Sequence, residues 1–205
     1  MGRIADFFGW PGDPAEQRMI TEIPGIERPN ANFLQVYGLG DVALPSVTID
    51  SALRVPAVLA AATFLPRSLA ALPLHAYRKT KAGPEKINGG IETLIHEAPN
   101  AEWTSFKLRQ YFWTQVFTGG RGLMLIERSG SNIVGLYPIN PTHANLKRDA
   151  MGRTTYQIGD KVYPASDVID VPFMLKADAL SHHGPIVLGA KAIQLALAMQ
   201  EYGAK

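Results

Sequence analysis

The hydrophobic pattern of this chain changes period at one segment, Gly119-Gly120-Arg121-Gly122. Between residues 56 and 118, apolar side chains recur at the spacing of amphipathic helices. Between residues 123 and 171 they alternate instead, as they do in half-buried strands. Helices that precede a run of short strands predict an α+β fold. The chain has too few strand–helix alternations for a doubly wound sheet.

The first helix is expected to begin at Pro56, because the missing N–H of proline costs nothing at the first position of a helix. Pro66 is expected to kink or interrupt this helix, and Pro73 is expected to end it. The residues that follow predict a short strand over Leu74–Arg78 and then a basic turn over Lys79–Pro84.

Two further helices are expected before the glycines. A short one covers Ile91–Glu97. A longer one begins after an N-cap at Thr104 or Ser105 and runs to about Thr118, where Gly119-Gly120 ends it. Apolar residues nearly encircle this longer helix, so we expect it to be buried between other elements.

The second half of the chain predicts a meander of short antiparallel strands. With 19 Gly and 15 Pro, the chain has the turn residues that such short elements need. We expect strands over Leu123–Glu127, Ile133–Tyr137, His143–Lys147, Thr154–Ile158, Lys161–Tyr163 and Val168–Val171. A final helix is expected to start at Gly184-Pro185, with one apolar face carrying Ile186, Ala190, Ile193 and Leu197.

Residues 1–50 differ from the rest of the chain. Five prolines interrupt every candidate element, so we predict an extended, Pro-rich arm over 1–50 before an α+β domain over 51–205. The arm carries 3 basic and 7 acidic residues, whereas the domain carries 17 and 11. A short apolar group in the arm either packs as an ordinary chain end or docks on a neighbouring subunit: Ile4, Phe7, Phe8 and Trp10.

The composition excludes several classes of protein. The chain has no cysteine, which removes disulfides, zinc–thiolate sites and cysteine nucleophiles. The first residues lack the apolar run of a signal peptide. The longest uncharged apolar stretch, Val55–Pro66, has 12 residues, whereas a membrane span needs about 20. We therefore expect no membrane association.

No motif indicates catalysis or cofactor binding. A phosphate-binding loop requires the order strand, glycines, helix, whereas Gly119–Gly122 follow a helix and precede a strand. We therefore interpret these glycines as a helix stop. The chain has no Gly-x-Ser-x-Gly segment, and no serine lies in a setting that would activate it. The sequence predicts no catalytic residues, no cofactor and no enzymatic activity.

The histidines do not predict a metal site. Asp178 and His182 have helical spacing, but Gly184-Pro185 indicates a loop there, and the adjacent side chains of His182 and His183 tend to point apart. The other three histidines, His75, His96 and His143, are isolated in the sequence.

Two small basic groups lie on or beside turns. We single out Lys79 and Lys81 in the first and Lys147 and Arg148 in the second. They are either solvated loop tips or weak contacts to nucleic-acid phosphates. No interleaved aromatic residues suggest base stacking.

Taken in order, six segments resemble HK97-type phage portal proteins, over roughly residues 45–203. They are Leu72–Arg78, Ala98-Pro99-Asn100 with Thr104-Ser105-Phe106, Gly120–Arg128, Leu136–Pro141, Val168–Val171 and Gly184-Pro185-Ile186. The match covers the N-terminal part of that family, chiefly the wing. The chain departs from the family at Arg121 and Leu123, where Asn and an aromatic residue are usual.

The resemblance implies a structural subunit of a ring, usually dodecameric, at one vertex of a phage or prophage capsid. Double-stranded DNA would pass through the ring's channel during packaging and ejection, without being read in sequence. The weak net charge of the domain suits such sliding. The implied partners are further copies of the chain, the terminase large subunit, the head–tail connector and the major capsid or scaffolding protein. The implied location is the virion, after assembly in the host cytoplasm.

Family members are much longer than this chain, and their stem and clip lie beyond its last residue. We therefore expect an N-terminal fragment, with the apolar face of Ile186, Ala190, Ile193 and Leu197 as a subunit interface. The alternatives are a standalone adaptor or binding module that reuses a wing-like fold, and a non-functional prophage remnant. If that face is exposed, the incomplete portal is favoured, and if it is fully covered, the standalone module is favoured.

Overall fold

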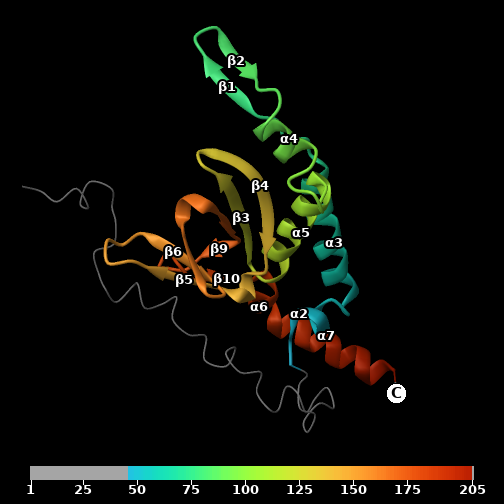
Figure 1. The fold of residues 1–205 in the computed structure, drawn as a ribbon. Coiled ribbons are helices and arrows are strands. Elements are labelled where there is room, and N and C mark those ends of the chain that lie inside the picture. The colour runs from blue at the N-terminus through green and yellow to red at the C-terminus, as the bar shows by residue number, and fades with distance from the viewer. Residues whose placement is uncertain (1–45, 205) are drawn as a thin grey trace, which may run out of the picture. The chain divides into compact units, whose positions relative to one another are not determined.

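A computed structural model describes residues 46–204 of the chain (Figure 1). All of the described residues belong to one structural unit, within residues 44–205. Most of the predicted arm, with the apolar group at Ile4, Phe7, Phe8 and Trp10, therefore lies outside the described residues.

The first described helices are α2 (Ile49–Ala52) and α3 (Pro56–Ala71). Helix α2 thus includes the last two residues of the predicted arm. Pro56 occupies the first turn of α3, as predicted. Of the predicted kink or interruption at Pro66, the interruption is wrong, because α3 continues through this residue to Ala71. The ring of Pro66 is fully buried, and its packing offsets the backbone hydrogen bond that proline cannot make.

After α3, strands β1 (Tyr77–Thr80) and β2 (Gly83–Lys86) form an antiparallel hairpin. Strand β1 thus begins three residues and ends two residues after the predicted strand over Leu74–Arg78. The predicted turn over Lys79–Pro84 is shorter than expected, because Gly83, with a φ of +127°, lets an unpredicted strand, β2, begin within it. Helix α4 (Ile91–His96) follows, within one residue of its predicted range.

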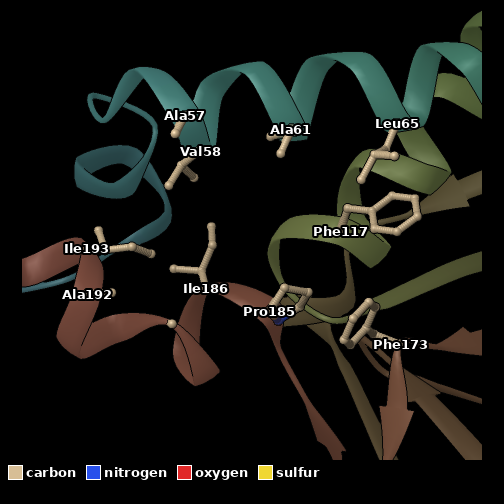
Figure 2. Close-up of a pocket in the computed structure, with 12 residues that line it drawn as sticks. Ala57, Val58, Ala61, Leu65, Phe117, Phe173, Pro185, Ile186, Ala192 and Ile193 are labelled. Atoms are coloured by element: carbon tan, nitrogen blue, oxygen red, sulfur yellow. The ribbon is translucent and has the colours of Figure 1, made fainter. Parts of the chain in front are cut away.

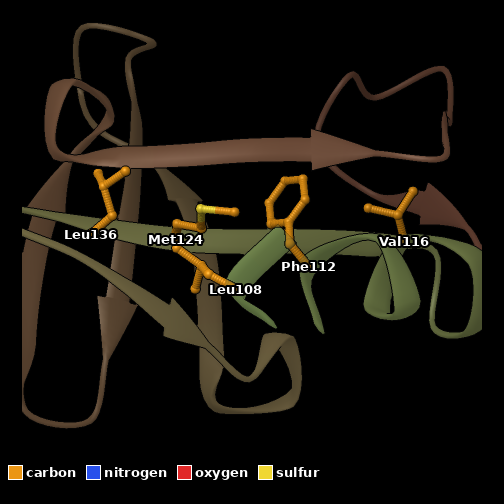
Figure 3. Packing of buried hydrophobic residues seen from close by; sticks show 5 residues of the cluster. All are labelled: Leu108, Phe112, Val116, Met124 and Leu136. Carbon is orange, nitrogen blue, oxygen red and sulfur yellow. The ribbon is translucent and has the colours of Figure 1, made fainter. Parts of the chain in front are cut away.

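Helix α5 (Ser105–Thr118) is buried, as its sequence predicts. The Thr104 side chain accepts a hydrogen bond from the backbone N–H of Lys107 and so caps the helix. Helix α5 packs against α3 on one side and against two strands on the other (Figure 1). Figure 3 shows the core cluster that it forms with those strands, made of Leu108, Phe112, Val116, Met124 and Leu136.

The six strands of the predicted meander form two three-stranded antiparallel sheets. The strands are β3 (Arg121–Ser129), β4 (Asn132–Ile139), β5 (Ala144–Arg148), β6 (Thr154–Ile158), β7 (Lys161–Pro164) and β8 (Val168–Pro172). The first sheet has the order β4-β3-β8, and the second has the order β5-β6-β7. The meander is thus antiparallel, but β8 returns to pair with β3 instead of its sequence neighbour β7.

A second core cluster joins the two sheets. Leu123, Ile139 and Val168 come from the β4-β3-β8 sheet, and Tyr156 comes from β6 of the other sheet. Short 3₁₀ turns at Pro141–His143 and Ala165–Asp167 carry the chain from one sheet to the other. The fold is therefore α+β, as the change of period predicts.

The C-terminal part of the described chain, from Met174 onward, contains a two-stranded ribbon and two helices. The ribbon pairs β9 (Met174–Leu175) with β10 (His182–His183). The predicted single helix is divided into α6 (Pro185–Leu188) and α7 (Ala190–Gly203), because the chain leaves helical geometry at Gly189. Within residues 46–204, no helix combines the length and apolar character that crossing a bilayer requires.

Candidate assembly surface

An apolar groove of about 450 Å³ runs between α3 and the α6–α7 pair (Figure 2). In Figure 2, Val58 and Ala61 of α3 form one wall, and Ile186 and Ile193 lie opposite them. Every side chain that lines the groove is apolar, and we call these residues the helical groove: Ala57, Val58, Ala61, Ala62, Leu65, Phe117, Phe173, Pro185, Ile186, Gly189, Ala192 and Ile193.

Helix α3 also exposes three large apolar side chains. Phe64 is 70% exposed, Leu59 is 50% exposed and Leu65 is 41% exposed. Arg67 is the only charged residue in this helix. The three side chains point to different sides of the helix, and Leu65 also lines the helical groove. We call Leu59, Phe64 and Leu65 the exposed α3 residues.

The predicted interface residues on the last helix do not share one exposed face. Ile186 and Ile193 are 6% and 8% exposed, and they pack against Ala52 and Val55 in a core cluster of this chain. Leu197 packs partly buried against the same cluster. Ala190 is half-buried at the start of α7.

The apolar side chains that this region does expose are different ones. Val187 and Leu188 are 74% and 54% exposed on α6. Leu195 and Met199 are 43% and 63% exposed on α7. The periodicity correctly placed Ile186, Ile193 and Leu197 on one apolar face, but that face packs against this chain itself.

The two predicted basic groups lie on different hairpins. Lys79 is in β1 and Lys81 is in its turn, on the hairpin that projects beyond α4 in Figure 1. Lys147 and Arg148 lie on β5, where the Lys147 ammonium donates to Gln157 Oε1 and Arg148 donates to the backbone oxygen of Asp178. The structure thus does not join these four residues into one basic patch.

A buried polar junction, which the sequence analysis did not predict, links the two sheets. The Arg121 side chain, 5% exposed, forms an ion pair with Asp170, with 3.1 Å between Nε and Oδ1. The other Asp170 oxygen accepts a 2.7 Å hydrogen bond from the Tyr156 hydroxyl. Arg121 also donates to the backbone oxygen of Leu180. Burial and the Asp170 carboxylate raise the pKa of Tyr156, so this hydroxyl remains a donor.

The glycines around Arg121 allow close packing, in agreement with their interpretation as a helix stop. Gly120 has a φ of +94°, and a Cβ there would lie 2.5 Å from the Cα of Gly184. A Cβ on Gly122 would lie 2.8 Å from the side chains of Phe112 and Val116. Strand β3 can therefore approach α5 and the start of α6 only where side chains are absent.

The histidines fall into two settings. Asp178 accepts hydrogen bonds from the backbone N–H groups of Leu180 and Ser181, and His182 Nε2 lies 3.2 Å from the backbone oxygen of Gly119. His75 and His96 are not isolated, contrary to the sequence interpretation. Their rings stack with 4.3 Å between centroids, because the chain folds back between β1 and α4.

Comparisons with known proteins identify the family. A profile of the family described as phage portal protein matches residues 56–205. The chain belongs to the phage portal protein family. It is 30% identical over 188 residues to a probable portal protein of Streptomyces phage phiC31, which covers 83% of this chain and 40% of the phage protein.

Two solved structures share the fold. One is an HK97 family phage portal protein from Corynebacterium diphtheriae, with a TM-score of 0.56 and 17% identity, matched over 78% of this chain and 50% of that one. The other is a chain from the neck of an empty GTA particle, with a TM-score of 0.59 and 15% identity, matched over 83% of this chain and 48% of that one. The chain thus spans half or less of the length of these relatives.

Proposed function

We propose that this chain acts as part of a portal subunit, which assembles with further copies of itself into a ring at a capsid vertex. The observation that carries the proposal is the match of the family profile to residues 56–205. In this proposal the role is structural, and the ring forms the channel through which double-stranded DNA is packaged and ejected.

The exposed apolar surface supports this assembly role. A ring subunit needs two unlike faces, one for each neighbour. The exposed α3 residues and the exposed side chains of α6 and α7 place large apolar groups in contact with water. Burying them between subunits would lower the free energy of the assembly. We assign Leu59, Phe64, Val187 and Leu188 to subunit contacts, in place of the buried Ile186 and Ile193.

The charge distribution supports a DNA contact that is weak and independent of sequence. Lys79, Lys81, Lys147 and Arg148 lie on separate hairpins, so they offer scattered phosphate contacts and no binding groove. Such contacts would allow DNA to slide past the ring. The proposed partners beyond DNA are the terminase large subunit, the head–tail connector and the major capsid or scaffolding protein. The proposed location is the virion, after assembly in the host cytoplasm.

The second candidate is a standalone adaptor with a wing-like fold. This candidate expects the face of Ile186, Ala190, Ile193 and Leu197 to be covered, and the burial of Ile186 and Ile193 against this chain favours it. The exposure of Val187 at 74% and of Leu188 at 54%, elsewhere on α6, favours the portal subunit.

The test is mass photometry and electron microscopy of the purified chain, compared with a Phe64→Asp variant. We expect the wild-type chain to form oligomers at rising concentration and the variant to remain monomeric. Met151→Asp is the matched control, because Met151 is 79% exposed but lies in the turn between β5 and β6. Oligomers that persist in Phe64→Asp, or a wild-type chain that stays monomeric throughout, would contradict the proposal.

A further inference from the structure

Three potential metal ligands meet where the β1–β2 hairpin joins α4. Glu92 and His96 lie one turn apart on α4, so their side chains share a face of that helix. His75 lies two residues before β1 and meets them from the other side. One nitrogen or oxygen atom from each of the three lies within 4.8 Å of the other two.

The Glu92 carboxylate is the negative centre of this group. It is 7% exposed, and its two oxygens lie 2.6 Å from His75 Nδ1 and from the backbone nitrogen of Ala76. Both oxygens are thus engaged by hydrogen bonds, which favour the charged form of the carboxylate. A buried, ionised carboxylate requires a compensating positive charge or donor.

A cation already occupies part of this position. The Lys86 ammonium lies 3.4 Å from the same Glu92 oxygen that faces His75. The Lys86 side chain is 46% exposed and flexible, so it can withdraw into water when another cation arrives. The His96 ring, whose Nδ1 lies 3.1 Å from the backbone oxygen of Leu74, is exposed and can also adjust.

We propose that His75, Glu92 and His96 bind a divalent transition-metal ion, with Zn²⁺ as the representative. The ion would take the place of the proton between His75 Nδ1 and Glu92, and that proton would move to the Nε2 atom of the same ring. The Lys86 ammonium would leave the carboxylate. Two imidazoles and one carboxylate form a ligand set that zinc uses, with water in the fourth position.

The chemistry distinguishes this site from a general cation site. Imidazole nitrogens favour zinc and its neighbours in the first transition row, whereas Ca²⁺ and Mg²⁺ prefer oxygen ligands. Zinc–ligand distances of about 2.0–2.2 Å place the ligand atoms of a tetrahedral site roughly 3.3–3.5 Å apart. His75 Nδ1 and Glu92 Oε1, now 2.6 Å apart, would therefore separate slightly, and the third ligand atom already lies within 4.8 Å of the other two. The bound ion would tie the hairpin to α4, independently of whether the chain assembles into a ring.

The test is calorimetric titration of the untagged 205-residue chain with ZnCl₂ at neutral pH. We expect one saturable site per chain. Removal of a ligand in His96→Gln should weaken binding by at least about tenfold, by analogy with the loss of orienting partners at known sites. His143→Gln is the matched control, because His143 lies in the turn before β5, and it should bind as the wild type does.

A second variant tests the competition with lysine. Lys86→Gln should raise the affinity for Zn²⁺, by roughly threefold or more, because it removes a like charge beside the ligand oxygen. Zn²⁺ should also raise the melting temperature of the wild type but not that of His96→Gln. The proposal is overturned if the wild type shows no saturable site, if His75→Gln and His96→Gln together leave binding intact, or if Mg²⁺ binds as well as Zn²⁺.

Discussion

Helices α3 and α5 lie side by side and have similar lengths, yet they differ in how they are covered. Helix α5 packs against α3 and against strands β3 and β4, so Phe112 is only 5% exposed. Helix α3 packs mainly against α5 and borders the helical groove, and Phe64, on another side of the helix, is 70% exposed. The same kind of side chain therefore has opposite roles in neighbouring helices. One stabilises the monomer, and the other is available to a partner.

The largest expected effect comes from the covered helix. Phe112→Ala should lower the free energy of unfolding by about 4 kcal/mol, because it removes a large side chain from the core and leaves a cavity. Phe64→Ala should lower it by less than about 0.5 kcal/mol, since that ring lies mostly in water. Urea denaturation of both variants measures the contrast. Equal losses would mean that α3 and α5 are covered to the same extent.

The polar junction between the sheets is expected to rank next. Asp170→Ala should lower the free energy of unfolding by about 3 kcal/mol, because it leaves the buried Arg121 guanidinium without its counter-charge. The double variant Asp170→Ala with Arg121→Met should recover part of this loss, since no unpaired charge remains. If the double variant is less stable than the single one, the ion pair is not the source of the effect.

The attachment of the hairpin to α4 should depend on pH. The folded-state pKa of Glu92 is about 2 and its ordinary value is 4.5. A lowered pKa contributes stability above the ordinary value, and that stability is lost as the pH falls from about 5 towards 2. In Glu92→Gln, the midpoint of urea unfolding should therefore decrease less with falling pH over this acid range than it does in the wild type. A variant whose acid profile matches the wild type would show that Glu92 makes no such contribution.

Much of the fold could be predicted because its signals are local. The Thr104 cap, the turns at glycines and the alternation in β3 to β8 all depend on residues close in sequence. The pairing of β8 with β3 could not be predicted, because it joins segments about 45 residues apart. The alternation of apolar residues identifies a strand but does not determine which other strand it pairs with.

The site residues were harder to predict for the same reason. Arg121 and Asp170, like His75 and His96, become neighbours only when the chain folds. On the last helices, Ile186, Ile193 and Leu197 share one face, as their spacing predicts, but this chain covers that face itself. A hydrophobic pattern identifies an apolar face, but it does not say whether the chain itself or a partner covers that face.

The smallest expected effect on stability accompanies the largest effect on assembly. Phe64→Asp should leave the free energy of unfolding within about 0.5 kcal/mol of the wild-type value, because the position is exposed. The most direct test is therefore multi-angle light scattering of the wild type and Phe64→Asp over the same concentration range. If the exposed α3 residues form an assembly surface, the mass of the wild type should rise with concentration, and the mass of the variant should stay at that of one chain. A constant monomer mass for both proteins would contradict it.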